Sequence, residues 1–136
     1  TNNENKNRGY MEVDKVLSTA KDAFGNESNT YMGFCCYFCL HFIQTGEYTR
    51  ADKYVHIMMN IKRELEYFER KVLKDLFKDY ITQIRSEIEK FGLNRGNNDQ
   101  IYFNILRNIF EYEIKNGKLM NIALKNTMEN SNNNNN

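Results

Sequence analysis

The sequence has 136 residues, of which 19 are Lys or Arg and 18 are Asp or Glu, so the formal net charge is +1. This near-neutral balance argues against a binder of nucleic acid or anionic membranes, because such proteins carry a basic excess on one face. The length suits a single domain, and no run of about 18 apolar residues is present to span a bilayer as a helix.

Asparagine is unusually frequent, with 21 residues gathered at both ends and scattered between them. Together with abundant Lys, Ile and Tyr, this usage resembles that of proteins encoded by AT-rich protozoan genomes. The asparagine tracts at the two ends lack apolar anchors, so we predict disordered polar tails at residues 1–10 and 129–136. Because the chain starts at Thr1 without a Met, we also expect a fragment of a larger protein.

Between the tails, residues 11–128 should form one all-α domain, a helical bundle of four to five helices. Proline is absent, and apolar side chains recur every three or four residues, which is the helical period. The first helix should run from Met11 to Phe24 and end at Gly25, because glycine readily takes the left-handed conformation that closes helices.

The second predicted helix covers residues 31–45, is capped by Asn29 or Thr30, and ends at Gly46. It is apolar on almost every side. A helix without a polar face is normally covered on several sides, so we expect this one at the centre of the bundle.

A long helical pattern then runs from Thr49, the start of a capping-box variant, to Phe91. One continuous helix would be about 60 Å long, whereas a compact domain of this size is only about 35 Å across. The rod must therefore project, bend or split. The apolar stripe shifts around the axis between Val72 and Leu73, so the first half should pack on the second helix and the second half on the elements that follow.

The remaining chain predicts a polar linker over residues 92–98 and a helix from Asp99 to Lys115. An Asn-Gly pair at residues 116–117 is a strong turn signal. A short last helix should follow, from Lys118 to Met128.

The three cysteines, Cys35, Cys36 and Cys39, lie close together on the second predicted helix. A disulfide-stapled secreted domain would spread its cysteines along the chain, so unpaired thiols in a reducing intracellular environment are favoured. A hairpin about Gly46 would bring His56 opposite, and Cys36, Cys39 and His56 could then bind zinc or respond to redox changes. Core packing explains the cysteines better, because free cysteine behaves as a small hydrophobic residue.

No other residue pattern predicts catalysis, and we expect neither an enzyme nor a bound cofactor. The carboxylates of residues 64–89 alternate with Lys and Arg at four-residue spacing, as on a solvated helix face. Phosphate-binding glycine loops, calcium loops and metal-binding His motifs are absent from the sequence.

Residues 38–55 carry a pattern of large and small apolar residues. Phe38 and Cys39 are followed by Phe42, then by a Gly-x-aromatic turn at Gly46 and Tyr48, and by a small residue at Ala51. This pattern resembles a tetratricopeptide-type helical hairpin, and the resemblance implies two antiparallel helices in close contact. It departs at Val55, Met58 and Arg63, and no second copy follows at the 34-residue period of that family.

We therefore expect a non-catalytic protein-protein interaction module, either accepting a partner helix in a groove or self-associating. The metal- or redox-responsive module based on the cysteines is the alternative. The candidate partner-binding residues lie on the long helical stretch, where apolar side chains exceed what a small domain can cover. They are Tyr67, Leu73, Phe77, Tyr80 and Ile81.

Overall fold

The computed structural model describes residues 2–26, 28–91, 99–116 and 127–129. All regular structure in these residues is helical, which confirms the predicted all-α bundle. Five long helices are described: α1 (Asn2–Phe24), α2 (Asn29–Gln44), α3 (Tyr48–Tyr67), α4 (Lys71–Phe91) and α5 (Asp99–Lys115). The predicted linker, most of the predicted last helix and residues 130–136 lie outside the described residues.

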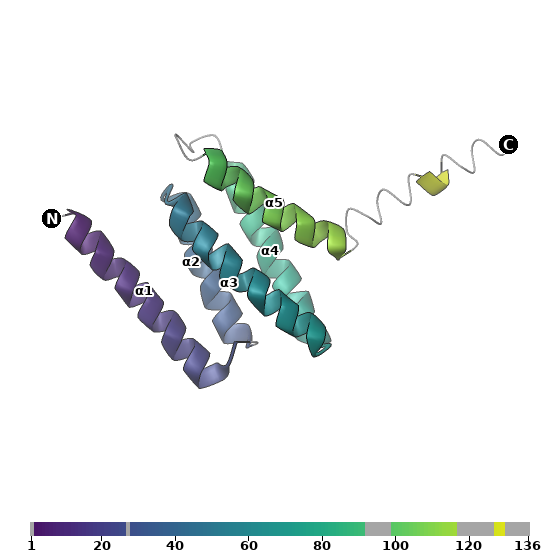
Figure 1. Ribbon diagram of the computed structural model, residues 1–136, viewed down its shortest axis with the longest axis horizontal. Helices are drawn as coiled ribbons and strands as arrows, with labels where there is room; N and C mark the ends of the chain where they lie inside the picture. The colour runs from purple at the N-terminus through teal and green to yellow at the C-terminus, as the bar shows by residue number, and fades with distance from the viewer. Residues whose placement is uncertain (1, 27, 92–98, 117–126, 130–136) are drawn as a thin grey trace.

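The helices form two layers, with α3 and α5 in front of α2 and α4 and with α1 along one edge (Figure 1). Helix α2 contacts α1, α3 and α4, which confirms its predicted central position. Helix α4 packs against α2 as well as α5, so the second half of the predicted rod contacts an earlier element in addition to a later one.

The long stretch splits after Tyr67, and the chain reverses direction. Glu69 takes a left-handed conformation with φ of 51°. Its N–H donates to the carbonyl of Glu66, and the N–H of Arg70 donates to the carbonyl of Leu65. This is the Schellman pattern that usually places glycine at the left-handed position. Two helices of ordinary length replace the rod.

Apart from the start of α1, the other helix ends fall close to the predicted residues. Gly25 and Gly46 both have positive φ, 89° and 77°, and close α1 and α2 as expected. The caps differ from prediction: Ser28 accepts a hydrogen bond from the N–H of Tyr31, and α3 begins after Glu47 without a side-chain cap. The predicted capping box at Thr49 is therefore not formed.

Helix α1 begins at Asn2, nine residues before the predicted start, so most of the predicted disordered tail at residues 1–10 is helical. The packing of Tyr10 against the bundle explains the difference. Once that turn is fixed, each earlier residue extends the helix without a new nucleation step. Glu4 in the first turn also interacts favourably with the helix dipole.

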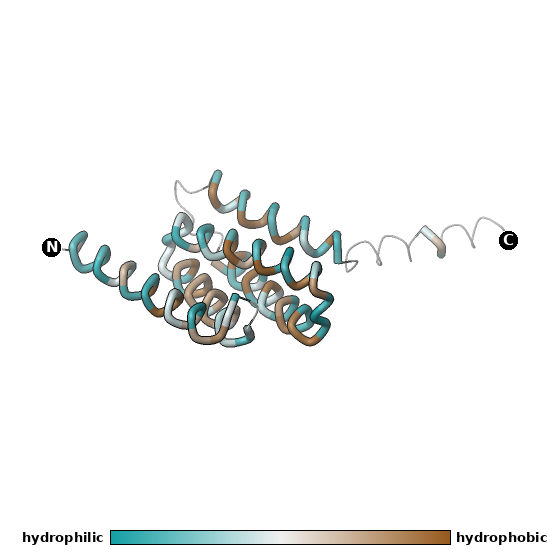
Figure 2. The backbone as a smooth tube through the Cα atoms, turned by 60° about the horizontal axis from the view of Figure 1, so that its bottom comes forward, coloured by the Kyte–Doolittle hydropathy of each residue, from teal (hydrophilic) through white to brown (hydrophobic). Residues whose placement is uncertain are grey.

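The core lies where α2, α3, α4 and α5 face one another, while the N-terminal half of α1 is hydrophilic (Figure 2). The largest fully buried side chains of the core include Tyr48, Tyr54 and Phe77. The O–H of Tyr48 donates to the carbonyl of Phe91 at 3.0 Å, which satisfies a buried hydroxyl at the end of α4.

Candidate functional site

Helix α1 rests on the bundle through few buried side chains. Among its described residues only Leu17 and Ala20 are buried, each 5% exposed. Tyr10 and Val13 are partly covered and pack against the core. A helix of 23 residues thus contributes little to the core, and much of its apolar surface remains outside it.

Polar groups fasten α1 to α3. Asp14 Oδ1 accepts hydrogen bonds from Lys53 Nζ at 3.1 Å and from the Tyr54 O–H at 3.3 Å, and Arg50 Nη2 lies 3.5 Å away. Burial alone would raise the pKa of Asp14, but the hydrogen bond and charge of Lys53 and the charge of Arg50 outweigh burial and lower it. The carboxylate is therefore ionised at neutral pH and holds two cations.

Tyr10 makes a second polar contact one turn earlier on α1. Its O–H donates a hydrogen bond to Glu47, which raises the pKa of Tyr10. The Arg50 guanidinium lies 4.2 Å from the centre of the Tyr10 ring, in a cation–π contact. The ring also packs edge-on against Phe42 of α2 at 5.7 Å.

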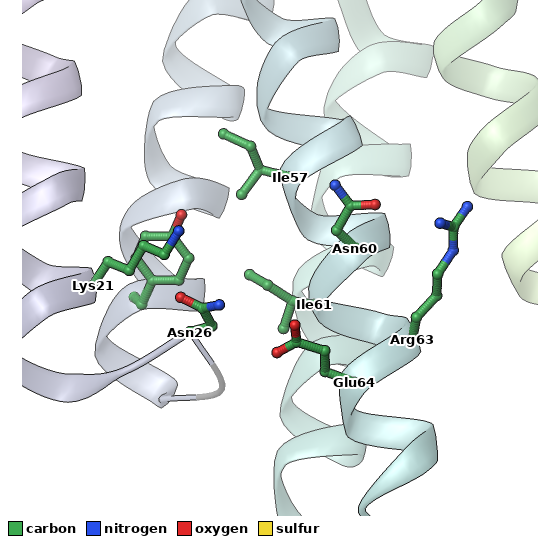
Figure 3. A pocket seen from close by; sticks show the side chains of 8 residues that line it. Lys21, Asn26, Ile57, Asn60, Ile61, Arg63 and Glu64 are labelled. Carbon is green, nitrogen blue, oxygen red and sulfur yellow. The ribbon is translucent and has the colours of Figure 1, made fainter.

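A hollow of about 570 Å³ separates the C-terminal part of α1 from α3. Lys21 and Asn26 lie on one side of it, and Ile57, Asn60 and Arg63 lie on the other (Figure 3). We call it the inner hollow.

Two further hollows of about 350 Å³ each lie where α1 meets the outer edge of α2. Phe34 lines one and stacks at 6.3 Å on Phe38, which lines the other. Val16 follows Val13 by one turn on the same side of α1, so the two hollows are consecutive. We call this pair the outer groove, with its main lining from Tyr10, Val13, Val16, Ala20 and Phe24 of α1 and Phe34, Tyr37 and Phe38 of α2.

The outer groove exposes large apolar side chains to solvent. Tyr37 is 65% exposed, Phe24 62%, Val16 41% and Phe34 38%. Isolated exposed apolar residues are ordinary, but a contiguous apolar groove marks a binding surface. From residue 9 to residue 24 the groove follows α1 for about 22 Å, roughly the length of a 15-residue helix.

The charged residues lining the outer groove are mainly basic. Lys6 and Lys15 line it, together with His41. The one acidic lining residue, Glu47, accepts hydrogen bonds from Tyr10 and Thr45. The groove therefore combines an apolar floor with cationic edges.

The cysteines do not form the alternative metal site. All three thiols are buried, and burial raises the pKa of Cys35 and of Cys36 to about 12, so both remain protonated at neutral pH. Cys39 Sγ contacts the carbonyl of Ala51 at 3.6 Å. His56 is on the surface beside Asp52, at 3.3 Å. In the described part of the chain no three His, Cys, Asp or Glu residues are grouped so as to hold a metal ion.

The partner-binding residues predicted on α3 and α4 are not one exposed set. The prediction is wrong for Phe77 and Ile81, which are 1% and 0% exposed, because α4 turns this face into the core. Leu73 and Tyr80 are partly buried, and the Tyr80 O–H donates to Asn29 Oδ1 at 2.5 Å. Tyr67 is 81% exposed, at the reversal between α3 and α4.

The sequence prediction missed the outer groove. The available signal was the second helix itself, which is apolar on more sides than its neighbours can cover. Phe34 and Tyr37 lie on the side of α2 that α3 and α4 leave open. Which aromatic residues remained uncovered depended on the position of α1, and a periodicity argument does not fix that position.

Comparisons with protein-family models, curated proteins and solved structures found no match to this chain. None of the described helices is long and apolar enough to cross a membrane.

Proposed function

We propose that this chain is a non-catalytic protein-interaction module that binds an amphipathic helix of a partner protein in the outer groove. The observation that carries the proposal is the continuous exposed apolar lining of α1 and α2. Phe34 and Tyr37 supply aromatic anchors, the residue types that dominate binding energy at interfaces.

The charges of the groove narrow the partner class. Lys15 would attract a carboxylate. Lys6 would do so as well, but its charge also acts on Glu47, so Lys15 contributes most of the attraction. An acidic amphipathic helix therefore fits best, with apolar side chains at three- and four-residue spacing toward the floor and Asp or Glu at its edges.

The geometry of α2 and α3 supports a rigid platform for such binding. These two helices are consecutive, are joined at Gly46 and pack against each other. Ala51 is 0% exposed, and its carbonyl meets the thiol of Cys39 at 3.6 Å. These small residues let the two helices approach closely, so the floor of the groove belongs to a well-packed pair.

The test uses a display library of 16-residue amphipathic helical peptides whose polar faces range from acidic to basic. Selected peptides should be predominantly acidic and should shift the NMR signals of Val16, Phe34 and Tyr37. Because a buried aromatic anchor contributes about 1.4–2 kcal/mol, Phe34→Ala and Tyr37→Ala should each weaken binding at least about tenfold.

A matched control comes from Val72 on α4, which is 73% exposed but lies outside the lining of the outer groove. Val72→Ala should leave the affinity unchanged. The proposal fails if the selected peptides bind both groove variants as tightly as the original chain, or if their NMR shifts fall on another surface.

A further inference from the structure

Helix α5 presents an apolar stripe on the surface that faces away from the bundle. Phe103, Phe110 and Ile114 are 55%, 38% and 43% exposed. With Arg107 they follow steps of four, three and four residues, which place all four side chains within about 60° of arc. This spacing is the seam of a two-helix coiled coil, here with Arg at one position.

The core does not use this stripe. Ile105, Ile109 and Tyr112 form the inward face of α5, and all three are buried against α3 and α4. Figure 1 shows α5 at the edge of the bundle, with its outer side turned away from the other helices. The stripe is thus a second apolar surface, independent of the outer groove.

We propose that α5 pairs with α5 of a second copy of this chain in antiparallel orientation. The argument is the symmetry of the stripe. About a two-fold axis midway between residues 108 and 109, Phe103 of each copy faces Ile114 of the other. The same axis places Arg107 of each copy over Phe110 of the other. One patch thus complements itself, as a two-fold dimer requires.

The charges agree with this register. A guanidinium over a phenyl ring is a favourable cation–π contact, and the antiparallel arrangement forms two of them. Arg107 keeps its hydrogen bond to Asn104 Oδ1 at 3.3 Å on the flank of the seam. A parallel arrangement would instead place Arg107 opposite Arg107, and like charges at facing positions repel.

The size of the stripe sets the strength of the dimer. From residue 103 to residue 114 it extends for about 16 Å, or three helical turns. One such helix face buries less than the roughly 1,200 Å² of a standard stable interface, so the dimer should be weak and form at micromolar or higher concentration.

Sedimentation velocity of the full chain from about 5 to 500 μM tests the association. The expected result is a reversible monomer–dimer equilibrium in that range. Phe110→Ala should shift the midpoint to at least about tenfold higher concentration, because it removes the ring that faces Arg107 of the other copy at both symmetric positions. Val72→Ala, at an exposed apolar site on α4 outside the stripe, should leave the midpoint unchanged. A monomer throughout the range, or an unchanged midpoint for Phe110→Ala, overturns the proposal.

Cysteine cross-linking tests the register. Chains carrying Phe103→Cys and chains carrying Ile114→Cys should form a disulfide when mixed and oxidised, whereas either variant alone should not. Identical positions lie about 16 Å apart along the axis, beyond the reach of about 7 Å for a disulfide. Cross-linking of either variant with itself indicates a parallel pair and overturns the antiparallel proposal.

Discussion

Leu17→Ala should release α1 from the bundle while leaving the other helices folded. Leu17 is the one large side chain of α1 that is buried, and it anchors the helix on α2. The remaining anchors are Ala20, the partly buried Tyr10 and the polar contacts of Asp14. The substitution therefore acts on a local contact and not on the common core.

The expected size follows from burial. Leu→Ala substitutions in protein cores destabilise by about 2–5 kcal/mol, and the lower end applies here because α1 is open to solvent along its flanks. A loss of about 2 kcal/mol corresponds to a roughly thirtyfold increase in the population with α1 detached. Partner binding in the outer groove should weaken as well, because α1 forms one wall of that groove.

Hydrogen–deuterium exchange resolved by peptide measures this effect. Protection of the amides of residues 10–24 should fall about thirtyfold, while that of α3 and α4 should hardly change. Val16→Ala, on the same helix but 41% exposed, is the matched control and should have little effect. Ile81→Ala, at a fully buried position of α4, should instead lower protection in every helix.

The reasoning is refuted if Leu17→Ala lowers protection equally in all helices, because α1 would then belong to the cooperative core. Unchanged protection of α1 would refute it equally, since the helix would then be held by contacts other than its buried leucine.

Three further predictions concern other features. Arg85→Met should destabilise the fold by about 3 kcal/mol in urea unfolding, because it removes the 2.6 Å hydrogen bond from Arg85 Nε to the buried Glu113 carboxylate. Adding Glu113→Leu should recover much of this loss, because it removes the carboxylate left without its partner. A double variant as unstable as Arg85→Met would contradict the view that the loss comes from the unpaired buried charge. The pKa of Asp14 is lower in the folded state than its ordinary value of about 4. The ionised Asp14 carboxylate therefore contributes its full stabilisation of the folded state above about pH 4, and this contribution is lost as the pH falls through the pKa that Asp14 has in the folded state. Exchange protection of α1 should therefore fall as the pH is lowered below about 4, and Asp14→Asn should reduce this pH dependence. The remainder belongs to Glu47, whose pKa is also lowered and which accepts the hydrogen bond of Tyr10. The three buried thiols, whose pKa values are raised by burial, should react with a thiol reagent at pH 8 only when urea unfolds the chain; rapid labelling of the folded chain would show that they are accessible.

Apolar periodicity and glycine were enough to predict most helices. Gly25 and Gly46 end α1 and α2, and the central position of α2 followed from its composition. The break after Tyr67 was harder to place, because the left-handed residue is Glu69 and carries no glycine signal. The shift of the apolar stripe pointed to Val72 and Leu73, a few residues too late.

The candidate site was less predictable than the fold. Excess apolar side chains on α4 suggested an exposed face, but Phe77 and Ile81 are needed in the core, where the Phe77 ring lies 5.1 Å from that of Tyr112. Pairwise packing of this kind depends on which helices meet, and local spacing does not determine it. The polar contacts of Asp14 join residues about 40 positions apart, so no sequence window contains them.

The contacts that hold α1 on the bundle also determine when this helix can dock during synthesis. A ribosome releases the chain from its N-terminal side, so α1 emerges before α2 and before Lys53 and Tyr54, which hold Asp14. The apolar side of α1 therefore stays exposed to solvent until the α2–α3 hairpin has formed. Helix α1 is thus made before the α2–α3 hairpin on which it docks, and nascent chains are open to chaperones at this helix until that hairpin has formed.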